Sequence, residues 1–122
     1  MVSPATRLAE PLDVVISDGT SLSAATSLAG RILVGIYIPA SWTAANISFQ
    51  AANNVADTFV DVYNTSGSEF LLTGAASSVY LPVDPINFYG VNAIKVRSGT
   101  TATPVNQSGD ITLTLMLAPA TR

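Results

Sequence analysis

Hydrophobic and polar residues alternate along this chain in short segments, which is the pattern of β-strands that bury one face. The strongest segment is 32–38, where isoleucine or valine occupies every even position and Leu33 and Tyr37 lie on the opposite face. Apolar side chains on both faces predict a central strand that is covered on both sides. Residues 111–117 carry leucine or isoleucine at every odd position, which predicts a second inward-facing stripe.

The same reasoning predicts about eight strands, separated by segments rich in Gly, Pro, Asn and Ser. Nine segments are candidates for these strands: 12–16, 21–28, 32–38, 46–50, 58–63, 69–73, 78–83, 93–98 and 111–117, of which 21–28 is the weakest. A hairpin loop at 64–68 is expected to pair 58–63 with 69–73, and Asp84-Pro85 is expected to start one short helical turn. This spacing favours an all-β fold, an antiparallel β-sandwich or jelly roll.

A chain of 122 residues is expected to form one domain. We assign residues 12–122 to it and interpret residues 1–11, which contain two prolines, as an extended N-terminal arm outside the sandwich. Such an arm is either a frayed terminus or a segment that orders against a neighbouring subunit. In the second case its candidate partner-binding residues are Val2, Pro4, Arg7 and Leu8.

The composition argues against an enzyme, because histidine and cysteine, which carry much of proton transfer and nucleophilic catalysis, are both absent. We therefore expect no catalytic residue, no cofactor and no metal site. Charged residues make up 11% of the chain, against about 25% in an average protein. A surface so poor in charge is expected to meet other protein.

Charge and hydropathy argue against two further classes of partner, nucleic acid and the membrane. A net charge of −3 disfavours nucleic acid, whose binders carry basic stripes. The longest apolar run, 32–40, is too short to cross a bilayer. Residues 1–11 lack the apolar stretch of a secretory signal, so we expect synthesis in the cytoplasm.

Few side chains suggest chemistry, and each has a structural explanation as well. Asp57 and Asp61 lie four residues apart and suit acid–base work or a shared cation, but solvation of a strand edge explains them equally. Lys95 and Arg97 share the outer face of one predicted strand. A solvated face or an ion pair between subunits accounts for them better than a phosphate contact does.

Trp42 is the strongest candidate contact residue outside the arm. It lies on the predicted loop after the strand 32–38, where an exposed indole would stack on a sugar ring or anchor an interface. The alternative is an indole that caps the end of the core. Tyr63, Tyr80 and Tyr89 are likewise either core edge or contact surface.

Two stretches resemble small virion proteins encoded by tailed bacteriophages. They are residues 30–50, GRILVGIYIPASWTAANISFQ, and residues 88–100, FYGVNAIKVRSGT, continued by PVNQ at 104–107. The likeness extends over most of residues 20–117. It implies a capsid decoration (cement) protein on the virion surface, often trimeric, that binds the lattice of the major capsid protein. It implies no individual site residue.

Two other functions stay open at this point. One is a head-fibre or tail-associated protein of the same virion, which the sequence does not separate from a capsid cement. The other is a carbohydrate-binding jelly roll, favoured by Trp42 with Asn46 and Gln50 nearby. A cement protein needs a rigid sandwich and surfaces that are easily desolvated, and the low charge of this chain suits that need.

Overall fold

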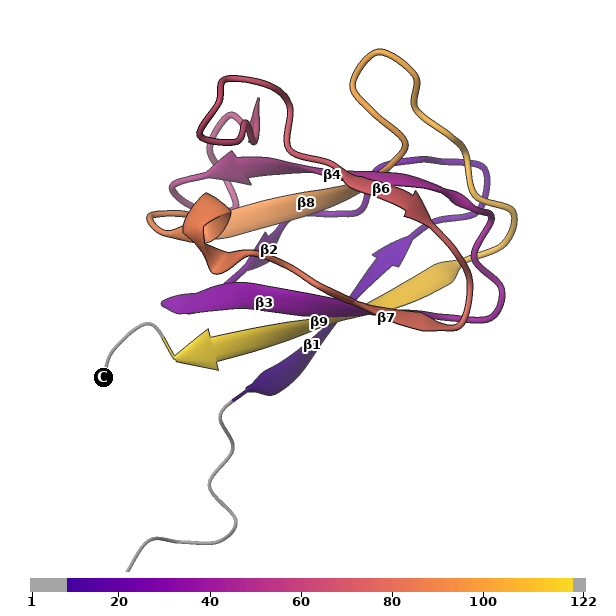
Figure 1. The fold of residues 1–122 in the computed structure, drawn as a ribbon, viewed down its shortest axis with the longest axis horizontal. Coiled ribbons are helices and arrows are strands. Elements are labelled where there is room, and N and C mark those ends of the chain that lie inside the picture. The colour runs from indigo at the N-terminus through magenta and orange to yellow at the C-terminus, as the bar shows by residue number, and fades with distance from the viewer. Residues whose placement is uncertain (1–8, 120–122) are drawn as a thin grey trace, which may run out of the picture.

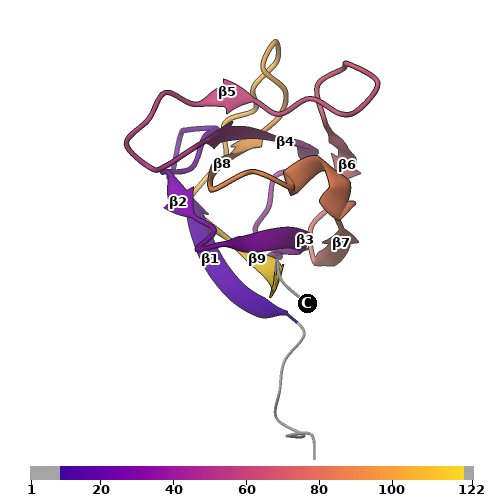
Figure 2. The same ribbon diagram turned by 90° about the vertical axis from the view of Figure 1, so that its left-hand side faces the viewer.

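The computed structural model describes residues 9–119, which fold into two antiparallel sheets packed face to face (Figures 1 and 2). The prediction of an all-β sandwich is thereby confirmed. The first sheet has the strand order β1-β9-β3-β7. Its strands are β1 (Glu10–Ile16), β3 (Arg31–Ile38), β7 (Val79–Pro82) and β9 (Ile111–Pro119).

The second sheet is built around β4 and has the order β2-β8-β4-β5, with β6 also paired to β4. Its strands are β2 (Thr26–Ser27), β4 (Ala45–Ala52), β5 (Val60–Asp61), β6 (Leu72–Ala75) and β8 (Ala93–Ser98). No helix within residues 9–119 is long and apolar enough to cross a membrane.

The core lies between the sheets and is made largely by the stripes that the alternation predicted, except that Leu33 is buried in the core and Val34 is not part of it. Ile36 in β3 and Leu113 and Leu115 in β9 have no exposed surface. Phe49, from β4, packs edge-on against Phe88 at a centroid distance of 5.1 Å. Burying each such side chain contributes roughly 1.5–3 kcal/mol. Every buried side-chain nitrogen and oxygen in the described part of the chain has a hydrogen-bond partner.

The predicted helical turn is confirmed as the 3₁₀ helix η1 (Pro85–Phe88). The Asp84 side chain caps it by accepting a hydrogen bond from the Ile86 amide at 3.1 Å. Proline at the first helical position removes a donor that would lack a partner there. The Phe88 side chain at the end of this turn is fully buried, so the turn anchors the chain to the core.

The strand predictions for the first 28 residues differ from the structure. β1 begins at Glu10, and both Glu10 and Pro11, which we assigned to the arm, pair with β9. The weak segment 21–28 forms only β2 and an isolated bridge, because it runs along the edge of the second sheet.

The predicted hairpin between 58–63 and 69–73 is reduced to one bridge, between Tyr63 and Glu69. Beyond that bridge β5 and β6 each pair with β4 instead. The Asn64 side chain closes the loop by accepting hydrogen bonds from the amides of Ser66 and Ser68 at 3.0 and 3.1 Å. The Arg97 guanidinium then pairs with a carboxylate from each segment, Asp61 and Glu69.

Candidate functional site

The outer face of the first sheet carries an ordered row of side chains across all four strands. Register places Asp13 opposite Thr114, Thr114 opposite Tyr37, and Tyr37 opposite Tyr80. The Thr114 hydroxyl donates a hydrogen bond to Asp13 Oδ1 at 2.8 Å. We call this surface the tyrosine face. Its outward-facing residues are Pro11, Asp13, Val15, Gly35, Tyr37, Tyr80, Pro82, Thr112, Thr114 and Met116.

The two tyrosines form an exposed aromatic pair at the end of this row, on β3 and the edge strand β7. Their ring centroids are 4.6 Å apart and the ring planes are tilted by 48°. Tyr37 is 52% exposed and Tyr80 44% exposed. Tyr80 leans across β3 so that its ring and hydroxyl occupy the place that a Cβ atom at Gly35 would take.

The tyrosine face is almost uncharged, since Asp13 is the one ionisable carboxylate or cation among its outward-facing positions. Large aromatic side chains supply much of the binding energy at protein interfaces, while lysine and glutamate are depleted there. Removing this face from water costs little, because few charges lose their hydration. The arrangement suits a contact with another protein.

The exposure of Tyr37 corrects one expectation. Apolar character on both faces of 32–38 predicted a strand covered on both sides. A register shift between Leu33 and Gly35 instead places Leu33 in the core, and Tyr37 is left exposed on the outer face. Period-two alternation shows which residues share a face, but it does not show whether a second layer covers that face. Gly35 was the signal that sequence reasoning missed, because a glycine inside a strand marks the close approach of another group.

Arg97 lies on the outer face of the second sheet, yet its side chain is only 8% exposed. It forms ion pairs with Asp61 and Glu69, both at 3.2 Å, and donates a hydrogen bond to the Thr101 hydroxyl at 2.8 Å. The interpretation of Arg97 as part of a solvated face or an intersubunit pair is therefore wrong. The loop after β8 folds back over the sheet and covers it, with the Val105 amide bonded to the Ser98 carbonyl.

The surroundings of Asp61 in this cluster favour its charged form. Burial is the largest single influence on Asp61 and disfavours its charge, but hydrogen bonds from Thr101, Arg97 and Gln50, together with the charge of Arg97, outweigh it and lower the pKa of Asp61. Asp57 does not join the cluster; its carboxylate accepts a hydrogen bond from Asn54 at 3.1 Å. The two aspartates therefore have separate partners, and residues 9–119 contain no group of three potential metal ligands.

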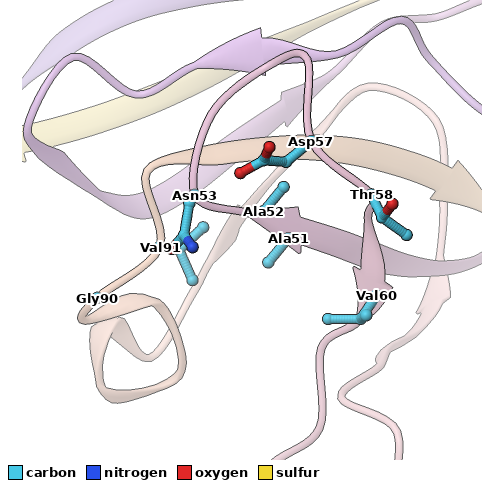
Figure 3. Close-up of a pocket in the computed structure, with 8 residues that line it drawn as sticks. All are labelled: Ala51, Ala52, Asn53, Asp57, Thr58, Val60, Gly90 and Val91. Atoms are coloured by element: carbon cyan, nitrogen blue, oxygen red, sulfur yellow. The ribbon is translucent and has the colours of Figure 1, made fainter.

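A groove of about 490 Å³ lies at the end of β4, between the loop that follows it and the turn before β8 (Figure 3). Its lining residues are Ala51, Ala52, Asn53, Asp57, Thr58, Val60, Gly90 and Val91. One carboxylate, one amide and one hydroxyl are its polar side chains, beside alanine and valine. These groups give no pair of carboxylates for acid–base chemistry.

Trp42 is a core residue. It is 5% exposed, and its indole N–H donates to the Ala75 carbonyl at 3.0 Å. The hypothesis of an exposed indole that stacks on a partner is therefore not supported, because the loop after β3 turns the ring inward, where β6 supplies the acceptor. The other four candidate contact residues, Val2, Pro4, Arg7 and Leu8, lie outside the described residues.

Tyr63 and Tyr89, which the sequence left undecided, are 58% and 61% exposed. They lie apart from the tyrosine face: Tyr63 follows β5 in the second sheet, and Tyr89 follows η1. Each therefore provides a natural comparison for the paired tyrosines.

No protein-family model and no curated protein matches the chain. Among solved structures, the chain is similar to the crystal structure of the SPBc2 prophage-derived protein YomS, with a TM-score of 0.48 and 14% sequence identity. The match covers 94% of this chain and 98% of that chain.

Proposed function

We propose that this chain is a non-enzymatic structural protein of a tailed-bacteriophage virion, and that it is a capsid decoration (cement) protein. In this role it binds the lattice of the major capsid protein as a homo-oligomer, most simply a trimer at the threefold positions of an icosahedral shell. The tyrosine face is the observation that carries the proposal. It combines two exposed aromatic rings with a single charge on the outer face of one sheet.

Two further features support the proposal. The stretches 30–50 and 88–100 resemble small virion proteins of tailed phages, and the first contains Gly35 and Tyr37 of the tyrosine face. The sandwich itself is well ordered internally, with a continuous apolar core and satisfied buried polar groups within residues 9–119. A rigid body loses little conformational entropy on binding, and many weak contacts on a lattice add through avidity.

The test is binding to particles. Purified protein is expected to cosediment with capsids that lack it, at micromolar concentration, and to raise their resistance to heat or chelators. Folded protein that fails to cosediment would overturn the cement role. A head-fibre or tail-associated location remains the alternative within the same virion, and imaging of labelled particles distinguishes shell from tail.

A carbohydrate-binding role loses the residue on which it depended, since Trp42 is buried. The exposed Tyr37–Tyr80 pair offers aromatic rings on which a sugar would stack instead. Binding of the protein to an oligosaccharide array, lost in Tyr80→Ala but retained in Tyr63→Ala, would favour it over the cement role.

A further inference from the structure

The strand β1 forms an open edge of the first sheet. It is seven residues long, and its partner within the described chain is β9 alone. A long edge strand presents a row of backbone donors and acceptors that an extended peptide can pair with. Proline and charged side chains on an edge strand disfavour its pairing with another strand. In β1 these are Pro11 and Asp13, beside the terminal Glu10, and the other residues are apolar.

A groove of about 320 Å³ runs beside this edge, between β1 and the segment that leads into β2. Figure 2 shows β1 and β2 on the same side of the sandwich. The groove is lined from β1 by Asp13, Val14 and Val15, and from the facing segment by Ala24, Ala25 and Thr26, with Ser17 completing it. Small side chains at 24 and 25 let another backbone approach closely, and neither residue belongs to a strand.

The charge of the described domain, together with Asp13 in the groove, favours a cationic occupant. Residues 9–119 contain all eight carboxylates of the chain but three of its five cations, a formal charge of −5. Arg31 and Arg97 are engaged in ion pairs inside the molecule, with Glu10 and with Asp61 and Glu69 respectively. No ion pair among the described residues includes Asp13, which is exposed at the groove.

We propose that this groove receives residues 1–8 of a second copy of the chain, so that neighbouring copies are joined by exchanged N-terminal segments. This inference rests on the proposed function, because it supplies the self-association that a lattice protein needs. The segment reads Met-Val-Ser-Pro-Ala-Thr-Arg-Leu, and it places one cation, Arg7, among small and apolar side chains. That composition complements a groove with one carboxylate and an alanine-rich wall.

The lengths also agree. An extended segment of eight residues spans about 26 Å, and a strand of seven residues about 23 Å, at roughly 3.3 Å per residue. Residues 1–8 are therefore long enough to lie along the whole of β1. Val2 and Leu8 would then contact the apolar part of the groove, and Arg7 would pair with Asp13.

A second copy fits better than the same chain. To lie along its own β1, the segment must reverse direction just before Glu10, which is already paired with Leu117. Tight reversals between strands use Gly, Asn or Asp, and residues 8–10 are Leu-Ala-Glu. Pro11 also restricts Glu10 to extended conformations. The junction therefore does not favour a return of the segment onto its own strand.

Disulfide trapping tests this arrangement, and the chain suits it because it has no cysteine. One chain carries Ala5→Cys in the segment, and a differently tagged chain carries Ala25→Cys in the groove. After mixing at micromolar concentration and mild oxidation, we expect a disulfide-linked heterodimer well above the yield from Ala5→Cys with Ala102→Cys, a control position in the exposed loop after β8. Equal yields for the two pairs would overturn the proposal, as would a double variant, Ala5→Cys with Ala25→Cys, that closes within a single chain.

A charge exchange gives an independent readout in sedimentation velocity. Arg7→Glu and Asp13→Lys are each expected to weaken self-association roughly five-fold, and the combination is expected to restore it, since the pair is then reversed rather than broken. Asp57→Lys makes the same charge change away from this groove and is the control. Single variants that change nothing, or a combination that is additive, would contradict the Arg7–Asp13 contact. Failure of trapping together with intact cosedimentation on capsids would overturn this inference alone and leave the proposed function standing.

Discussion

Gly35 in β3 provides the space that the Tyr80 ring occupies, although the two residues are not opposite each other in the ladder between β3 and β7. Gly35 is opposite Pro82, and Tyr80 is opposite Tyr37. The Tyr80 side chain leans diagonally across β3, and its hydroxyl and ring cover the glycine. This glycine therefore does not serve a turn. Because it lacks a side chain, it leaves room on the outer face of the sheet for the Tyr80 ring.

Gly35→Ala is expected to displace Tyr80 and to lower the free energy of unfolding by about 0.5–1.5 kcal/mol, the worth of a lost aromatic pair. The same substitution in a Tyr80→Ala background is expected to be neutral or stabilising, because alanine suits a strand interior better than glycine. Urea unfolding of the two single variants and the double variant measures this coupling. Additive effects would show that Tyr80 does not depend on Gly35.

The core stripes of β3 and β9 allow a direct test of stability. Ile36 and Leu113 are fully buried, so truncating either to alanine removes apolar contacts and leaves a cavity. We expect Ile36→Ala and Leu113→Ala each to lower the free energy of unfolding by roughly 2–5 kcal/mol in urea titrations.

Val15→Ala is the matched control, because Val15 lies on the same sheet but is 43% exposed. It is expected to change stability by less than about 0.5 kcal/mol. A loss of that small size for Ile36→Ala or Leu113→Ala would contradict the assignment of the core.

The Arg97 cluster predicts a pH-dependent stability. Arg97→Met leaves Asp61 and Glu69 partly buried without their cation, and it is expected to lower the free energy of unfolding by about 3 kcal/mol near neutral pH. Lys95→Met, on the same strand, removes only a contact with the Phe59 ring and is expected to cost about 1 kcal/mol or less.

The sign of the pH effect follows from Asp61. Its pKa is lowered in the folded protein from an ordinary value of 3.8, so its contribution to stability is present above that value and is lost as the pH falls through the folded pKa. In Arg97→Met the burial of Asp61 is no longer offset by the arginine. The destabilisation by Arg97→Met is therefore expected to shrink between neutral pH and about pH 3. A difference between variant and parent that is constant with pH would contradict this role for the cluster.

Much of the fold could be predicted from the alternation of apolar residues, because that pattern fixes which side chains share one face of a strand. For this reason the alternation predicts that Ile36 and Leu113 lie in the core. The position of Asp84 before Pro85 likewise predicts a helix cap. The coverage of each face depends on segments distant in the chain. Arg97 is buried by the loop that follows its own strand, and Trp42 is buried beside Ala75 in β6, so local patterns did not reveal either.

The candidate site was harder to predict than the core. Leu33 and Tyr37 lie at odd positions of the strand, between isoleucine and valine, and this alternation predicted a second buried face. Within the described residues no second layer covers Tyr37, which is 52% exposed. Leu33 is buried because the register shift before Gly35 turns it to the inner face. The pairing of Tyr37 with Tyr80 is set by the register between β3 and β7, which no local pattern specifies.

The tyrosine face gives the last prediction, which concerns capsid binding. Exposed aromatic rings at the centre of an interface typically contribute more than 1 kcal/mol each. Tyr37→Ala and Tyr80→Ala are therefore each expected to weaken cosedimentation with capsids by about ten-fold, and Asp13→Asn by less. Tyr63→Ala is the control, because Tyr63 is similarly exposed, at 58%, but follows β5 in the other sheet. Circular dichroism of each variant checks that the fold is intact. Unchanged binding of Tyr37→Ala and Tyr80→Ala, together with a loss in Tyr63→Ala, would place the contact on the second sheet, because only the residues buried by the partner respond to truncation.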